Sequence, residues 1–272
     1  MDPLEAALLG LVEGLTEYLP VSSTGHLILT QRLLGIEAGE AANSFSIAIQ
    51  GGAILAVLFA LRERTRQLAA GLVGRDGVGQ RLCVALLVAF VPAAALGLAF
   101  DDWIEARLFG LVPIVAAWAV GGVGILVLSR WLRARRSGGL GLDELRWKGA
   151  LAIGLFQCLA LWPGTSRSLA TLAGGLLAGL SLAAAVEFSF LLGVLTLGAA
   201  SSYAALKSGA VMLETYGLAE LVLGWLVAFG SALIAVRWLM AWVRTRDLAL
   251  FGWYRLALAF VVGLWLWSGG GT

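Results

Sequence analysis

Residues 13–26 read EGLTEYLPVSSTGH, and they interrupt an apolar segment that runs from about residue 4 to residue 34. Pro20 lies near the middle of this segment, and proline breaks a helix because it has no backbone N–H and clashes with the preceding turn. Each half is then only about 10 to 14 residues long, a length more typical of a re-entrant or interfacial helix than of a full crossing. We therefore predict a helix-break-helix hairpin that enters the membrane and returns.

A second segment, at about residues 149–180, has the same plan. It is broken by Pro163-Gly164 within the run PGTSRS at residues 163–168. Serine and threonine cluster at both breaks, and these residue types commonly cap the helix that follows them. The sequence thus predicts a second re-entrant hairpin.

The composition is that of a membrane protein. Of the 272 residues, 60% are hydrophobic and only 13% are charged, whereas an ordinary soluble domain carries about 25% charged residues. A soluble globule is excluded, and the net charge of +2 provides no bulk attraction to nucleic acid. We predict an all-α integral membrane fold of two hairpins and six transmembrane helices, at roughly 43–61, 82–100, 111–129, 183–206, 217–236 and 248–267.

Basic residues are concentrated in three alternate connections between the predicted spans. Fourteen of the 19 lie at 62–81, 130–148 and 237–246, whereas the intervening connections carry Asp101, Asp102 and Glu105, and then Glu214 and Glu220. Because lysine and arginine near the ends of spans mark the cytoplasmic side, we expect the basic connections in the cytoplasm. Both termini then lie outside, provided that each hairpin returns to the side it entered from.

The two halves of the chain resemble one another. A shift of 143 residues aligns four identical pairs, which are Pro20 with Pro163, Ser23 with Ser166, Phe45 with Phe188, and Ser46 with Ser189. Each half would hold one hairpin and three spans, and because three is odd the second copy must be inverted in the membrane. We therefore predict one membrane domain, 1–272, built from an inverted-topology repeat of about 1–135 and about 145–272. Chance similarity within an apolar chain is the alternative.

Few ionisable residues lie in the broken segments, where a charge is costly and marks a functional candidate. Glu13 and Glu17 are four residues apart, so both carboxylates lie on one face of the first half-helix. His26, the only histidine of the chain, lies three residues after Ser23, and Arg167 is the only charged residue of the second hairpin. Five further hydroxyl residues accompany them at the breaks: Ser22, Thr24, Thr165, Ser166 and Ser168.

These residue types suit a phosphate group. A helix N-terminus presents unpaired backbone N–H groups and the positive end of the helix dipole, and the Arg167 guanidinium offers a fork of donors for phosphate oxygens. Two carboxylates beside an anion are unfavourable unless a hard cation lies between them, so Glu13 and Glu17 are predicted to bind Mg²⁺ or Ca²⁺. Each residue alone has a plainer interpretation, as a helix cap, a solvated carboxylate, a histidine satisfied by a backbone carbonyl, or an arginine reaching a lipid headgroup.

Both motifs, residues 13–26 and 163–168, resemble the two signature motifs of the bacterial undecaprenyl-diphosphatase family, also called bacitracin-resistance proteins. The resemblance extends to residues 45–55 and 187–192 and so covers most of the chain. It implies a bacterial inner-membrane phosphatase that removes the terminal phosphate of undecaprenyl diphosphate and regenerates the monophosphate carrier for cell-wall synthesis. The positions that match the family's essential residues are Glu13, Glu17, Ser23, His26 and Arg167.

Several mechanistic alternatives stay open. The nucleophile is either Ser23 or a water molecule, and His26 acts as general base toward it or as general acid toward the leaving group. Glu187 is either an accessory to the metal site or a packing partner. The first hairpin is expected to enter from outside, which predicts an active site open to the extracytoplasmic face. A transporter of an anionic lipid or a small anion is the alternative function, and the sequence allows a homodimer.

Overall fold

The computed structural model describes residues 1–37, 39–134 and 138–269, apart from the side chains of Asp101, Asp102, Glu105 and Ser208. Within these residues the chain is helical, and its one β-bridge, between Leu140 and Leu180, is isolated. The first half contains α1 (Pro3–Thr16), α2 (Ser23–Leu33), α3 (Glu40–Ala60), α4 (Arg62–Leu72), α5 (Gly77–Leu108) and α6 (Leu111–Ala134). The second half contains α7 (Trp147–Gln157), α8 (Arg167–Leu177), α9 (Leu182–Tyr216), α10 (Leu218–Trp242) and α11 (Ala249–Trp267), with short 3-10 turns at Leu142–Glu144 and Cys158–Leu161.

The six predicted spans are confirmed as helices. Six helices of the described chain are long and apolar enough to cross a membrane, and they are Glu40–Ala60, Gly77–Phe100, Leu111–Ala134, Leu182–Lys207, Leu218–Trp242 and Ala249–Trp267. Each overlaps one predicted span, and the chain is therefore a multi-pass integral membrane protein.

Two connections predicted between spans are helical instead. Helix α5 continues to Leu108, so Asp101, Asp102 and Glu105 lie within it, and their side chains fall outside the described residues. Helix α9 continues to Tyr216, so Glu214 lies in its last turn. It ends only at Gly217, whose φ of 82° lies in the left-handed region that favours glycine. The predicted ends of these two spans agree with the apolar parts of the helices, which end at Phe100 and Lys207. The helices themselves continue further, because charged residues readily continue a helix. Two basic residues of the predicted 130–148 connection, Arg135 and Arg136, lie outside the described residues.

Both broken segments are helix-break-helix elements. Helix α1 ends at Thr16 and α2 begins at Ser23, with Pro20 between them. In the second segment α7 passes through the 3-10 turn at Cys158–Leu161, and α8 begins at Arg167 after Pro163. The breaks therefore lie where the prolines predict them.

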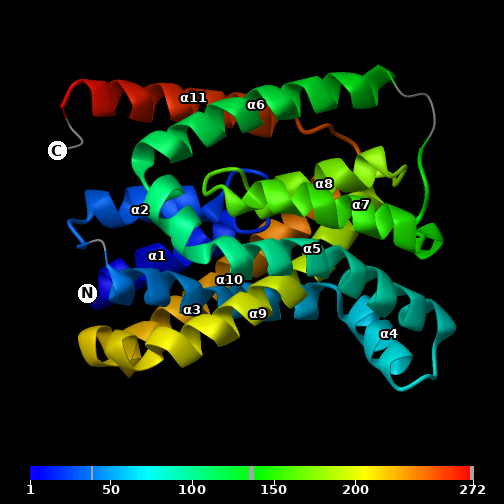
Figure 1. Ribbon diagram of the computed structural model, residues 1–272, viewed down its shortest axis with the longest axis horizontal. Coiled ribbons are helices and arrows are strands. Elements are labelled where there is room, and N and C mark those ends of the chain that lie inside the picture. The colour runs from blue at the N-terminus through cyan, green and yellow to red at the C-terminus, as the bar shows by residue number, and fades with distance from the viewer. Residues whose placement is uncertain (38, 135–137, 270–272) are drawn as a thin grey trace.

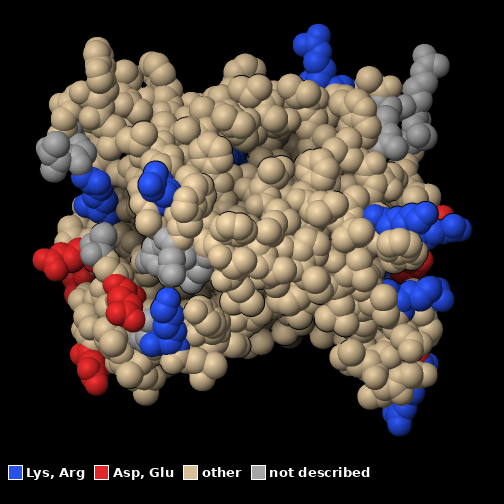
Figure 2. All heavy atoms as spheres, viewed as in Figure 1, with Lys and Arg blue, Asp and Glu red and all other residues tan. Residues whose placement is uncertain are grey.

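Figure 1 shows the helices running largely parallel or antiparallel, with the paired α6 and α11 along one side. Helix α10 packs against both α1 and α3, α3 packs against α9, and α7 packs between α5 and α8. Helix α4 and the start of α5 form an antiparallel pair at one end, whereas the start of α1 and the end of α11 lie at the opposite end (Figure 1). On the face shown in Figure 2, charged side chains gather toward these two ends and the band between them is almost entirely uncharged.

Small residues allow α1 to approach α10 closely. A Cβ built on Gly10 would meet the backbone of Gly224, and one built on Gly14 would meet the Ser231 hydroxyl and the Ala228 carbonyl. Such contacts are typical of helices in membranes, where close approach supplies much of the packing energy. They hold α1, and with it the first break, against the spanning helices.

Candidate active site

Helices α2 and α8 begin with the same local structure. Their N-caps, Ser22 and Ser166, have φ values of 73° and 77° and are the non-glycine residues with positive φ in the described chain. Each hydroxyl accepts a backbone N–H of the first turn, that of Gly25 at 3.4 Å and that of Leu169 at 3.3 Å. Such conformations cost of order 1–3 kcal/mol and occur mainly at functional sites.

The two caps, Ser22 and Ser166, lie 144 residues apart, one more than the shift of the internal alignment. The 143-residue shift pairs Ser23 with Ser166, whereas the structure pairs the caps Ser22 and Ser166, because the second break is one residue longer after its proline. Ser23 and Arg167 are therefore the corresponding first residues of α2 and α8.

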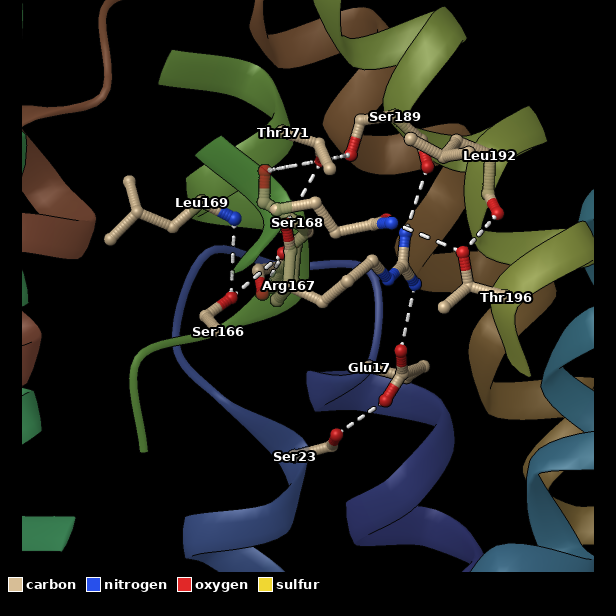
Figure 3. A network of polar contacts seen from close by, with 12 residues as sticks. Glu17, Ser23, Ser166, Arg167, Ser168, Leu169, Thr171, Ser189, Leu192 and Thr196 are labelled. Atoms are coloured by element: carbon tan, nitrogen blue, oxygen red, sulfur yellow. Dashed lines mark hydrogen bonds and ion pairs between the residues drawn. The ribbon is translucent and has the colours of Figure 1, made fainter. Parts of the chain in front are cut away.

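A buried ion pair joins the two broken segments. The Arg167 guanidinium donates from Nη2 to Oε1 of Glu17 at 2.8 Å, across 150 residues of sequence (Figure 3). The two side chains are only 10% and 5% exposed. Arg167 also donates from Nη1 to the carbonyl of Ser189 at 2.8 Å, and its guanidinium carbon lies 5.4 Å from the centre of the Tyr18 ring.

The other carboxylate oxygen of Glu17, Oε2, accepts a hydrogen bond from the Ser23 hydroxyl (Figure 3). Ser23, Glu17 and Arg167 thus form a continuous chain from a hydroxyl through a carboxylate to a guanidinium. A carboxylate that accepts from a serine hydroxyl is placed to take its proton, which is the arrangement of an activated nucleophile.

Hydroxyl groups of the second break hold it against the first. The Ser168 hydroxyl donates to the carbonyl of Leu19 at 2.9 Å and lies 2.9 Å from the Ser166 hydroxyl. One turn further, Thr171 and Ser189 share a hydrogen bond of 2.6 Å. Ser168 therefore acts as a bridge between the two breaks.

A cavity of about 570 Å³ opens beside this network. The polar side chains of the two breaks that line it, which we call its polar wall, are Glu17, Ser22, Ser23, Thr24, Ser166 and Arg167. Its apolar wall includes Phe90, Leu98, Ile104, Leu161 and Leu197. Such a cavity suits a ligand with an anionic head and a hydrocarbon chain, because each part finds a matching wall.

Both ring nitrogens of His26 already have hydrogen-bond partners, and neither partner is Ser23. Its Nδ1 lies 2.6 Å from the Ser22 carbonyl, which can only accept, so Nδ1 carries the proton. In the neutral ring Nε2 then accepts from the Tyr254 hydroxyl at 2.7 Å, and the two rings stack with centroids 5.7 Å apart. The structure thus brings Glu17, rather than the expected His26, against the Ser23 hydroxyl.

Glu13 is fully buried, and neither carboxylate oxygen has a hydrogen-bond partner among the described residues. A buried carboxylate without partners is unfavourable unless a cation or a proton accompanies it. The described chain brings together no group of three histidine, cysteine or acidic side chains. The unpartnered oxygens of Glu13 suit a hard cation, whereas both Glu17 oxygens already accept hydrogen bonds, from Arg167 and from Ser23.

Arg255 and Tyr254 on α11 also reach the site, and the search of the sequence missed them. Arg255 donates to the carbonyls of Gly164 and Thr165 at the second break, at 2.7 and 3.0 Å. It is the only charged residue of α11, and an isolated charge within an apolar span is itself a functional signal. Glu187, by contrast, accepts from Arg64 of α4 at 2.8 Å, which favours its interpretation as a packing partner.

Known proteins match the chain over most of its length. Residues 6–261 match the family model described as bacitracin resistance protein BacA. An undecaprenyl-diphosphatase of Sorangium cellulosum is 48% identical over 265 residues, which cover 96% of this chain and 85% of the relative. Undecaprenyl-diphosphatase 2 of Rhodospirillum rubrum is 47% identical over 270 residues, and undecaprenyl-diphosphatase of Methylibium petroleiphilum is 45% identical over 276 residues, each covering 98% of this chain and 96% of the relative.

Proposed function

The chain belongs to the bacitracin resistance protein BacA family, and from this membership we propose that it is an undecaprenyl-diphosphatase. It hydrolyses the polyprenyl diphosphate carrier lipid to the monophosphate and inorganic phosphate, which returns the carrier to cell-wall synthesis. The observation that carries this proposal is the buried chain of Ser23, Glu17 and Arg167, which joins both breaks beside a cavity with one polar and one apolar wall.

The diphosphate head would lie against the polar wall and the start of the polyprenyl chain against the apolar one. The first N–H groups of α2 and α8 have no acceptor within their own helices and can donate to phosphate oxygens. Of the five predicted substrate-binding hydroxyl residues, Ser22, Thr24 and Ser166 line the cavity and would contact the substrate, whereas Thr165 and Ser168 are not among its described lining residues and would support the second break. Arg167 uses one N–H of Nη1 and one of Nη2 on protein groups, and the second N–H of each can stabilise charge that develops in the transition state.

We favour Ser23 as the nucleophile and Glu17 as the base. The Ser23 oxygen forms a bond to the terminal phosphorus while its proton passes to Glu17, and the bond from that phosphorus to the bridging oxygen breaks. Undecaprenyl monophosphate leaves. Water then attacks the phosphoserine, releasing inorganic phosphate and restoring the serine. In the alternative route Glu17 activates a water molecule that attacks directly.

His26 would act as general acid toward the leaving group or as general base toward water, as the sequence suggests. Its Nε2 accepts from Tyr254, so an acid–base role requires that this bond be broken during turnover.

Glu13 and Glu17 would hold Mg²⁺ or Ca²⁺. The support for this is the pair of unpartnered, buried oxygens of Glu13. A divalent cation bound there would neutralise charge on the diphosphate.

We also propose an arrangement of the chain in the membrane. The two broken segments are re-entrant hairpins of an inverted repeat, and the site opens to the extracytoplasmic face of the bacterial inner membrane. The matching caps at Ser22 and Ser166 support the repeat, and the basic connections support the orientation. Labelling with a membrane-impermeant thiol reagent tests the orientation: a cysteine at Gly209 should react from outside intact cells and one at Gly74 should not.

Hydrolysis rather than transport is tested by phosphate release from undecaprenyl diphosphate by the purified chain in detergent with Mg²⁺ or Ca²⁺, where no gradient exists. The chain should release phosphate, Ser23→Ala and Arg167→Met should not, and Arg237→Met, which changes an exposed arginine of α10, should remain active. An acid quench should trap a phosphoprotein that Ser23→Ala lacks. Absence of phosphate release from the folded wild-type chain would instead support the transporter.

A further inference from the structure

Arg255 of α11 is a fully buried arginine. All five of its N–H groups find a separate backbone carbonyl. Nε donates to Trp118 at 3.4 Å, Nη1 donates to Pro20 at 3.2 Å and Thr165 at 3.0 Å, and Nη2 donates to Ala117 at 2.8 Å and Gly164 at 2.7 Å. We refer to these five carbonyls and the guanidinium as the Arg255 carbonyl cluster.

The cluster joins three segments that are distant in sequence. Pro20 belongs to the first break, Gly164 and Thr165 belong to the second, and Ala117 and Trp118 lie on α6. Carbonyls at a helix break lack the N–H partners that a continuous helix would provide, and leaving them unpaired away from water is costly. Arg255 supplies partners to both breaks at once from one rigid, planar group.

The position of this guanidinium is tightly constrained. The salt bridges found among the described residues do not include Arg255, so its buried charge is balanced by carbonyl dipoles alone. A buried charge is tolerated only when its hydrogen bonds are made, and any displacement would weaken several of them together.

Gly121 on α6 provides the space for the guanidinium. A Cβ built on Gly121 would meet Nη2 and would lie 2.7 Å from Cζ of Arg255. Gly124, one turn later on the same helix, has open space at the corresponding point. A Gly121→Ala substitution would therefore displace the guanidinium while residue 255 stays arginine, and Gly124→Ala is the matched control.

We propose that Arg255 is a positioning residue that fixes the two breaks relative to each other, and through them sets Ser23 against Arg167. Because all five donors are used on protein carbonyls, none is left for the substrate, so Arg255 acts through the breaks rather than on phosphate. Its neighbour Tyr254 holds His26, so one turn of α11 orients both the breaks and the histidine. The kinetic consequence rests on the proposed phosphatase function, whereas the structural consequence does not.

The test is hydrogen–deuterium exchange of the full-length chain in detergent, combined with phosphate-release kinetics. Two variants perturb the cluster: Arg255→Lys, which has three donors in place of five, and Gly121→Ala. Two matched controls are Arg237→Lys, at an exposed arginine of α10, and Gly124→Ala. Thermal unfolding followed by tryptophan fluorescence establishes that each chain is folded.

We expect amide exchange to rise by about tenfold or more in peptides covering residues 19–25 and 162–169 together, the change expected when a hydrogen bond to a charged group is lost. Exchange in α9 and α10 should be unchanged. The value of kcat should fall by about 100-fold, as expected for a misplacement of reacting groups by about 1 Å, with a smaller change in KM. Both controls should behave as the wild type.

Unchanged exchange at either break in the folded variants would overturn the proposal, as would a uniform rise across all helices, which would indicate loss of stability alone. If Arg255→Lys fails to fold while Arg237→Lys folds, the exchange measured in Gly121→Ala decides whether the proposal stands. A wild-type chain that releases no phosphate would contradict the proposed function, yet the exchange measurement would still test the positioning role.

Discussion

At the scale of single residues, Arg167 is held on several sides at once. It pairs with Glu17 and with the Ser189 carbonyl, and its guanidinium lies over the ring of Tyr18. The helix that faces it, α9, has a glycine at the point of contact, because a Cβ on Gly193 would meet Nη1 and lie 2.6 Å from Cζ of Arg167. The absence of a side chain at residue 193 is therefore part of the site.

Gly193→Ala tests this contact. The added methyl group should displace the guanidinium from Glu17 and lower kcat/KM by about 100-fold, a magnitude typical of small misplacements at reacting groups. Gly198→Ala on the same helix enters open space and is the matched control. Equal kcat/KM for the two variants would mean that Arg167 does not need its observed position.

Glu13→Gln tests the proposed cation site. Mg²⁺ or Ca²⁺ should raise the Tm of the wild-type chain by binding the folded state, and the shift should be largely lost in Glu13→Gln. The variant should still fold, because it removes a buried carboxylate that has no hydrogen-bond partner among the described residues. Glu214→Gln, at an exposed position of α9, should keep the full shift. An undiminished shift in Glu13→Gln would exclude Glu13 as a ligand.

Sequence reasoning found the residues at the breaks and missed those that support them. Glu17, Ser23 and Arg167 stand out because charge and hydroxyl groups are rare in apolar segments, and the structure joins them in one hydrogen-bonded chain. Which partner each would choose could not be predicted, since the Ser23 contact with Glu17 depends on how the chain turns at Pro20. Arg255 was predictable as an isolated charge in a span, but its partners are carbonyls, which carry no sequence signal.

At the scale of elements, the packing of α1 on α10 holds the first break in its place against the spanning helices. Gly10 and Gly14 let the two helices approach until their backbones nearly touch. The lengths of the spans followed from hydrophobicity, whereas the true ends of α5 and α9 did not, because a helix continues past its apolar part wherever its residues favour helix.

Gly10→Ala tests the importance of this approach. A methyl group there would meet the Gly224 backbone, which cannot rotate away as a side chain can. We expect the free energy of unfolding to fall by about 1–3 kcal/mol, a typical cost of overpacking, seen as a lower Tm in detergent. Gly230→Ala on α10, which meets open space, should leave the Tm close to the wild-type value. A Tm for Gly10→Ala equal to that control would show that α1 can move away from α10 without cost.

At the scale of the whole molecule, the two broken segments, one from each half of the chain, contact each other. The start of α1 and the end of α11 lie at the end of the molecule opposite α4 (Figure 1). The breaks, far apart in sequence, meet through the Glu17–Arg167 pair, the Ser168–Leu19 hydrogen bond and the Arg255 carbonyl cluster. The sequence predicted that the breaks contact each other, because the residues of both suit one anion. The number of residues between them could not predict their distance in space.

The central claim is that the two breaks act as one catalytic unit, and a double-mutant cycle on kcat/KM tests it most directly. Glu17→Gln and Arg167→Met are measured singly and together, after folding of each variant is confirmed by its Tm. If the pair serves one transition state, the double variant should lose little more activity than the worse single variant, because residues that act as a unit are strongly non-additive. Arg167→Met combined with Arg237→Met should be additive. Losses for Glu17→Gln and Arg167→Met that multiply independently would contradict the account.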